Sequence, residues 1–361
     1  MAQQNTASAT AVTVKIKGQE VTGDSISLAV DMVLNQPDMC VLTLRNDTNA
    51  HTAKYAFADE VEVLIGDDGT SVFKGEVVAI EPTYNASGEN TCVIRAYNRL
   101  HRLLRGRNSK TYVQQSDQDI AGAIAGDHGL SPKCGSSPKI QHEHVYQHNQ
   151  TDLEFLRLRA ARLGFEVWVE DKDLYFDEPK KDKDSGIKAR YGDAESSGRE
   201  GELFLKYFAP RMSSANIVHE VTVRGWDPEK KEEIVGKVTA SSSKLGSKTG
   251  DSETKKGFTA AKVFEVDTPI FSVDEAKAIA GARLAEHNMS FITGEGECRG
   301  DPRLKAGIVV TLTVNTDDSS DPFNGKYMLT GVTHVYRNSS RGGEEGGYTT
   351  TFRVARDASA P

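Results

Sequence analysis

The densest group of side chains that could do chemistry is a histidine cluster, His142, His144 and His148. Neutral imidazoles are common ligands of zinc, so this HxHxxxH spacing is compatible with a metal-dependent enzyme. On a strand, His142 and His144 would share a face. The HExxH signature of zinc proteases is not met, because Tyr146 occupies the position of its second histidine. We therefore expect surface histidines in a loop that precedes a helix. A β-rich metal-dependent enzyme built on this cluster is the alternative interpretation.

Other signatures of catalysis or cofactor binding are incomplete. Residues 294–300 resemble a dinucleotide fingerprint, but the motif is one residue too long and lies between a helix and a strand. The chain has no Gly-x-Ser-x-Gly motif. The cysteines have no CxxC pair and predict reduced thiols, not a disulfide framework or a zinc site; they are Cys40, Cys92, Cys134 and Cys298. We predict a chain that is not an enzyme, with no catalytic, cofactor-binding or metal-binding residues.

A basic stretch follows residue 98. Its arginines are positioned to meet phosphate, but we interpret them as the solvated face of a short helix anchored by Leu100, Leu103 and Leu104. The four arginines are Arg99, Arg102, Arg105 and Arg107.

The length, charge and hydrophobicity of the chain exclude several classes of function. The chain has 361 residues and a formal net charge of −8, which predicts two or three domains and argues against nucleic-acid specificity. No apolar stretch approaches the roughly 20 residues of a membrane-spanning helix, so we expect no membrane insertion. The first residues have neither a basic start nor an apolar segment, so we expect synthesis in the cytoplasm without a signal peptide.

The elements that must position these side chains are mostly strands. Short runs with period-two alternation predict an antiparallel barrel or sandwich over residues 10–100. These runs are 12–17, 25–30, 40–45, 60–65 and 91–96. Strand patterns resume at 216–223 and 233–238, and again at 307–356.

Three helices are predicted between the strands. One begins at Ser116 and ends near Gly129, and another has a capping box at Thr151 and a glycine stop at Gly164. A hairpin over 165–176 follows, which makes 105–178 an α+β insert. A third capping box starts a helix over 272–288. The charged segment 178–200 and the Ser/Gly/Lys-rich segment 239–257 predict solvated loops.

The two halves share a repeat. In each half an alternating strand and an acidic turn lead into a Phe-x-Gly step, at Phe73–Gly75 and at Phe323–Gly325. A later tyrosine and a closing strand follow in both. The glycine is explained by a bulge or a close approach between strands. The repeat predicts two similar β-barrels in one chain.

Three segments resemble the phage late-control gene D family and the N-terminal part of VgrG proteins. They are 97–106, then 147–156 with its continuation to 176, and 221–228 with 234–236. The resemblance covers about residues 10–356. It implies a mainly β fold with α+β inserts and two tube-like antiparallel β-barrels per chain. The predicted domains are a first β-barrel (1–104), an α+β insert with a charged linker (105–200), and a second β-barrel with the helix 272–288 and a flexible insertion at 239–257 (201–361).

The resemblance also implies a function. Members are central baseplate hubs of contractile injection systems: phage tails, R-type pyocins, extracellular injection particles and type VI secretion. We expect a homotrimeric structural protein, a tube–spike adaptor that contacts the inner tube protein, the spike protein and other baseplate subunits of a phage tail or tail-like particle. VgrG proteins continue into a spike, whereas this sequence ends after the second barrel. We therefore expect the spike to be a separate protein or to have been removed. A carbohydrate-binding barrel is a third interpretation, with only Trp168 and Trp226 available as an aromatic platform.

Overall fold

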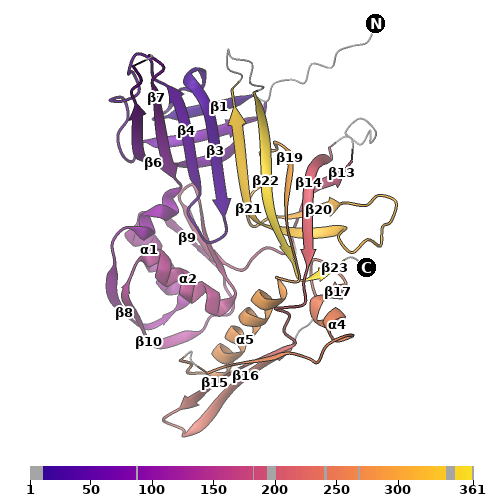
Figure 1. Ribbon diagram of the computed structural model, residues 1–361. Helices are drawn as coiled ribbons and strands as arrows, with labels where there is room; N and C mark the ends of the chain where they lie inside the picture. Colours follow the sequence, from indigo (N-terminus) through magenta and orange to yellow (C-terminus); the bar gives the residue numbers. More distant parts are fainter. Residues whose placement is uncertain are drawn as a thin grey trace.

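The computed structural model describes residues 11–86, 88–181, 183–192, 201–239, 242–266, 269–338 and 346–359. The fold is mainly β, as predicted. One 13-stranded sheet runs through both halves of the chain, and the helices gather at one end of it (Figure 1). No helix among the described residues is long and apolar enough to cross a membrane.

The first half forms an antiparallel sheet that we call the first β module. Its strands pair in the order β1-β5-β6-β7-β4-β3, and the two-residue β2 (Gln19–Glu20) pairs antiparallel with the end of β1. Alternate side chains, such as Val14, Val63 and Leu42, are fully buried in one core. The strands are β1 (Val12–Ile16), β3 (Ser25–Val33), β4 (Met39–Arg45), β5 (Glu60–Ile65), β6 (Thr70–Thr83) and β7 (Thr91–Tyr97).

The second half forms a closed six-stranded barrel, the second β module. The ring runs β21-β20-β13-β14-β19-β22 and closes through β22–β21 pairing. It is not wholly antiparallel as predicted, because β13 is parallel to both of its neighbours. The strands are β13 (Asp184–Tyr191), β14 (Leu203–Met212), β19 (Ile292–Arg299), β20 (Val309–Thr313), β21 (Gly325–Arg337) and β22 (Gly347–Arg356).

A pair of strands joins the two modules along a seam. Strand β3 pairs antiparallel with β21, from Ser27 opposite Arg337 to Val33 opposite Gly331. The Thr333 hydroxyl donates to Asp31 Oδ1 across the seam at 2.7 Å. Segments about 300 residues apart in sequence therefore lie side by side in one continuous sheet (Figure 1).

The first insert has the predicted α+β character. Thr151 and Glu154 form the expected capping box, and Gly164 ends the helix with a left-handed φ of 72°. Ser116 caps the preceding helix as predicted. The elements are η2 (Arg99–Leu104), β8 (Asn108–Ser116), α1 (Asp117–Asp127), β9 (Ser131–Cys134), β10 (Gln141–Gln150), α2 (Asp152–Leu163), β11 (Glu166–Glu170) and β12 (Asp173–Asp177).

The structure contains a second insert that the sequence did not predict. We expected the strand patterns after residue 214 to belong to the second barrel, but they form a separate three-stranded sheet that packs against the predicted helix. Val221, Val223 and Ile234 on the sheet meet Ala276 and Ile279 on the helix. The elements are β15 (Glu220–Asp227), β16 (Glu232–Thr239), β18 (Lys262–Glu265) and α5 (Val273–Asn288).

Both predicted loops contain ordered elements. Within 178–200, residues 184–191 form the barrel strand β13, because Ile187 and Ala189 alternate into the core and both strand edges find partners. Within 239–257, Leu245 is buried, and β17 (Lys248–Thr249) and α4 (Gly250–Thr254) follow. Strand β17 pairs with β23 (Ala358–Ser359). Residues 193–200 and 240–241 lie outside the described part.

Candidate functional site: the contacts between modules and inserts

The predicted histidine cluster does not form a common site. The three residues lie on strand β10 and not in a loop, and His142 is buried whereas His144 and His148 are exposed. Opposite this segment, Gln114 has a left-handed φ of 53°, and the burial pattern on β10 shifts between His142 and Val145. Among the described residues, no three His, Cys, Asp or Glu side chains gather around a point that could hold a metal.

His142 belongs instead to a buried network that joins the two inserts. Its Nε2 lies 2.8 Å from Arg159 Nη2 and 3.1 Å from Asp117 Oδ2, and its Nδ1 lies 3.7 Å from Glu275 Oε1. The Arg162 guanidinium donates to Glu275 at 2.6 Å. Because α1, β10, α2 and α5 each contribute, this inter-insert network fixes the position of one insert against the other.

The charges of this network compensate for burial. Burial raises the pKa of Asp117, but the hydrogen bond from His142 and the Arg159 guanidinium more than offset it, so the pKa lies below its usual range. Arg159 donates directly to the same carboxylate. His142 Nε2 lies within hydrogen-bonding distance of both Asp117 and Arg159, so this nitrogen is engaged inside the network. The imidazole therefore holds the two inserts together and is not free to ligate a metal through Nε2.

A second network fixes the first insert to the first β module. Arg99 is buried and contacts three carboxylates: Glu60 at 2.8 Å, Glu76 at 3.3 Å, and Asp171 at the tip of the β11–β12 hairpin. Arg102 also pairs with Glu76, through Nε at 3.0 Å. We call these five residues the Arg99 network.

The predicted role of this basic stretch is therefore wrong for its first member. Arg99 was expected in water, but it is buried, and Leu104, an expected anchor, is 45% exposed. Because η2 is a 3₁₀ helix with a three-residue period, Leu104 does not share the face of Leu100 and Leu103. Arg99 is buried because its guanidinium pairs with carboxylates of the first β module and of the β11–β12 hairpin. Leu100 and Leu103 do anchor it as predicted.

The second β module also buries an arginine, with different partners. Arg356 is fully buried, donates to the backbone carbonyls of Asn324 and Pro322 at 2.8 Å each, and lies 4.6 Å from the Tyr327 ring centroid. Burial lowers its pKa. This side chain ties the 315–324 loop to the end of β22 without a carboxylate at contact distance.

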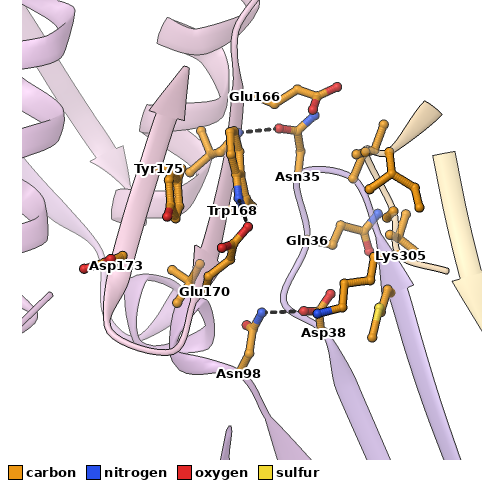
Figure 2. A pocket seen from close by; sticks show the side chains of 18 of the residues that line it. Asn35, Gln36, Asp38, Asn98, Glu166, Trp168, Glu170, Asp173, Tyr175 and Lys305 are labelled. Carbon is orange, nitrogen blue, oxygen red and sulfur yellow. Dashed lines mark hydrogen bonds between the residues drawn. The ribbon is translucent and has the colours of Figure 1, made fainter. Parts of the chain in front are cut away.

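A cavity of about 590 Å³ lies where the first module, the first insert and the second module meet (Figure 2). The β3–β4 turn forms one wall, the β11–β12 hairpin another, and residues 305–308 a third. Asn35, with a left-handed φ of 59°, accepts a hydrogen bond from Val167 N at 2.7 Å and so ties the turn to the hairpin. Burial raises the pKa of Asp38 and of Glu166, each to about 7.

None of these contacts was located by the sequence patterns. They rest on single polar residues at positions that alternation assigns to a surface. An asparagine with a left-handed φ in a turn, or a helix-capping residue, can be recognised from the neighbouring sequence. The residue that it contacts in another module or insert cannot.

Comparisons with known proteins bear on the family and on the fold. The family described as Alg8 N-terminal domain matches residues 6–338. No relative appears among the curated proteins.

Several solved structures share the fold over nearly the whole chain. A 43 kDa tail protein of prophage MuSo2 from Shewanella oneidensis has 14% identity and a TM-score of 0.68, with 97% of this chain and 100% of that chain covered. A tail protein from Neisseria meningitidis MC58 has 15% identity and a TM-score of 0.67, with 98% and 100% covered. The E. coli c3393 protein, described as a type VI secretion component with similarity to the T4 tail proteins gp27 and gp5, has 14% identity and a TM-score of 0.61, with 94% and 76% covered.

Proposed function

We propose that this chain, which belongs to the Alg8 N-terminal domain family, is a structural hub of a contractile injection baseplate. In this role it is a trimeric adaptor that joins a hexameric inner tube to a trimeric spike. It acts through extended surfaces and has no catalytic site. Its place is a phage tail or tail-like particle, next to other baseplate subunits.

The observation that carries the proposal is that the similarity to tail proteins includes every part of the chain. The first β module, both inserts and the closed barrel together match two tail proteins over 97% and 98% of this chain and the whole of theirs. A shared β module alone would occur in many unrelated proteins.

In this proposal, the presence of two β modules in each chain lets a trimer match the sixfold symmetry of the tube. A hexameric tube offers six equivalent docking positions, and a trimeric spike offers three. Three copies of a chain with two similar modules present six related faces, while the inserts keep threefold symmetry. Large permanent interfaces of this kind usually bury more than about 2,000 Å².

The directions of the strands distinguish two ends of the β modules, one that carries the inserts and one that carries short loops. The inserts follow β7 and β14, and both lie at one end of the modules (Figure 1). The turn after β6 lies at the opposite end, next to the loop after β4, because Asn46 N donates to Asn90 O at 2.8 Å. In our proposal this loop end contacts the tube and the insert end contacts the spike. The Arg99 network and the inter-insert network then carry force between the ends.

Two exposed aromatic residues provide a matched test of this orientation. Tyr84 lies at the loop end and is 61% exposed, and Trp226 lies on the second insert and is 60% exposed. Particles from the producing cell should contain three copies of the chain. We expect Tyr84→Asp to abolish co-purification of tube protein and to spare the spike. Trp226→Asp should do the reverse.

The same experiment has a clear negative result. Loss of both partners in both variants, with folding intact by circular dichroism, would contradict the assignment of the ends. Particles that lack this chain altogether would contradict the hub role itself.

A further inference from the structure

The cavity where the first module, the first insert and the second module meet has features that the hub role does not use. At about 590 Å³ it is within the usual size range of small-molecule sites, roughly 300–1,000 Å³. We call it the junction cavity. Its walls combine one aromatic surface with several carboxyl groups, a combination that suits a particular class of ligand.

The aromatic surface comes from one face of the β11–β12 hairpin. Trp168 and Tyr175 are cross-strand partners, and their rings stack with centroids 4.7 Å apart and planes at 4°. Carboxyl groups flank the pair on the same face, since Glu166 and Glu170 alternate with the buried Val167 and Val169. Figure 2 shows the indole of Trp168 between Tyr175 and the turn that carries Asn35 and Gln36.

Two carboxyl groups of the cavity lack a strong cationic partner. No hydrogen bond or ion pair within the described residues reaches the Glu166 carboxyl, and only the more distant charge of Lys181 favours its ionised form. Asp38 accepts one hydrogen bond, from Asn98 Nδ2 at 2.8 Å, and the charge of Lys305 acts on it from farther away. Figure 2 shows the two groups at opposite ends of the cavity, Glu166 beside Asn35 and Asp38 beside Asn98, so a single cation can meet only one of them. Glu166 shares its strand face with Trp168 and is therefore the carboxyl group next to the aromatic pair.

The chain already places one ammonium group next to this aromatic pair. Lys180 Nζ lies 5.6 Å from the ring centroids of both Trp168 and Tyr175, within the range of cation–π attraction. Lys180 is exposed and its methylene chain is flexible, so it competes with an incoming cation for the rings.

We propose that the junction cavity binds a primary ammonium group on a short methylene chain, held between the indole of Trp168 and the carboxyl group of Glu166. This chemistry is common to free diamines and to a lysine side chain of a partner protein. The site does not depend on the hub role.

Titration calorimetry of the intact chain with 1,5-diaminopentane tests the site, with 1-pentanol as the uncharged control. We expect saturable binding of the diamine and none of the alcohol. Because a bound cation favours the ionised carboxylate, the diamine should release protons, more at pH 6.5 than at pH 8.5. The group involved is Glu166, with Glu170, Lys180 and Lys181 as the charged groups near it.

Variants assign the binding to the cavity. Glu166→Gln should weaken it at least tenfold, and Lys180→Ala should tighten it severalfold by removing the internal competitor. Trp226→Phe, far from the cavity, should leave it unchanged and makes Trp168 the only indole, whose emission then reports binding. Nα-acetyl-lysine amide distinguishes the sources: binding of this compound without the diamine identifies a protein side chain as the ligand, and binding of both identifies free amines as ligands as well.

The proposal fails on any of three results. They are no saturation with either the diamine or Nα-acetyl-lysine amide at millimolar concentration, equal affinity for the Glu166→Gln variant with its fold intact, or weaker binding to Lys180→Ala.

Discussion

The two β modules have similar strand patterns, but in the described part of the chain only the second closes its sheet into a ring. In the second module six strands close into a ring, whereas in the first module β1 and β3 do not pair with each other within the described residues. The free side of β3 is covered by β21 of the second module instead. An unpaired strand edge invites association, so the first module depends on its neighbour for protection while the second protects itself. We infer that a repeat can keep its strand pattern and still differ in which edges remain available for assembly.

The buried arginines show the same difference in chemical terms. Arg99, at the edge of the first module, is surrounded by the carboxylates of Glu60, Glu76 and Asp171. Arg356, inside the second module, contacts carbonyl groups and an aromatic ring. The first arginine joins separate parts of the chain through charge, and the second fixes a loop of its own barrel through hydrogen bonds.

The largest expected effect is on the Arg99 network. Arg99→Met removes one of the two guanidinium groups that contact the buried Glu76 and leaves Arg102 in place, so we expect about 3 kcal/mol, the lower end of the cost of breaking a buried ion pair. Arg356→Met leaves two carbonyl groups without donors and no orphaned charge at contact distance, so we expect about 1–3 kcal/mol. Chemical denaturation of both variants measures the difference. Equal losses would show that Arg102 and water compensate the carboxylates that Arg99 contacts.

The next largest difference in stability is expected between alanine substitutions of the two glycines in the repeated Phe-x-Gly step. A Cβ at Gly75 would meet the Tyr97 carbonyl oxygen at 2.3 Å, and backbone cannot easily give way. At Gly325 it would meet only the tip of Arg356 at 3.0 Å, although φ is +123°. We expect about 2–3 kcal/mol for Gly75→Ala and about 1–2 kcal/mol for Gly325→Ala.

Gly281→Ala, in open space on α5, is the control for this pair and should be neutral or slightly stabilising. Melting temperatures of the three variants rank the effects. If Gly325→Ala were less stable than Gly75→Ala, the positive φ at Gly325 would matter more than the close backbone approach at Gly75, contrary to our expectation.

The local parts of the fold followed from the sequence because their signals are local. Period-two alternation predicted the strands of the first module, and capping residues at Ser116, Thr151 and Ser272 marked three helix starts. The repeat predicted two β modules, although its two glycines serve different purposes: Gly75 permits a close approach, and Gly325 adopts a left-handed φ.

What failed was the assignment of strands to sheets. Alternation at 216–238 is the same for a barrel strand and for the second insert, since both have one buried face. Strand β13 was missed because its charged neighbours lower the average hydrophobicity, while its barrel partners come from distant segments. The networks around Arg99 and His142 depend on such distant pairings and left no pattern in the sequence.

The smallest expected effects are on pH dependence, and they have opposite signs in the two regions. The Glu166 carboxyl, with a usual pKa of 4.5, is raised to about 7 by burial in the junction cavity. The folded state therefore binds the proton more tightly, and this contribution to stability is lost as pH rises through about 7. Glu166→Gln should match the wild type near pH 4.5 and be more stable by a few degrees above pH 7.

His334 in the second module behaves oppositely. Burial lowers its pKa from 6.5 to about 4, and its ring lies 2.7 Å from the Tyr348 hydroxyl and 3.0 Å from the Leu304 carbonyl. Its contribution to stability is present above pH 6.5 and is lost as pH falls toward 4. Proton NMR of the imidazole should show no titration until near pH 4. A midpoint at 6 or above would contradict the burial of this ring.

The central claim is that three copies present six β modules in one ring, and the structure of the assembled particle tests it most directly. Light scattering of the isolated chain gives a mass, but a monomer alone does not decide, because partners can drive assembly. Electron cryomicroscopy of the baseplate should show three copies, with first and second modules alternating around the axis and each β3–β21 seam inside one copy. A ring of six copies, or a ring in which only one module of each chain takes part, would contradict the account.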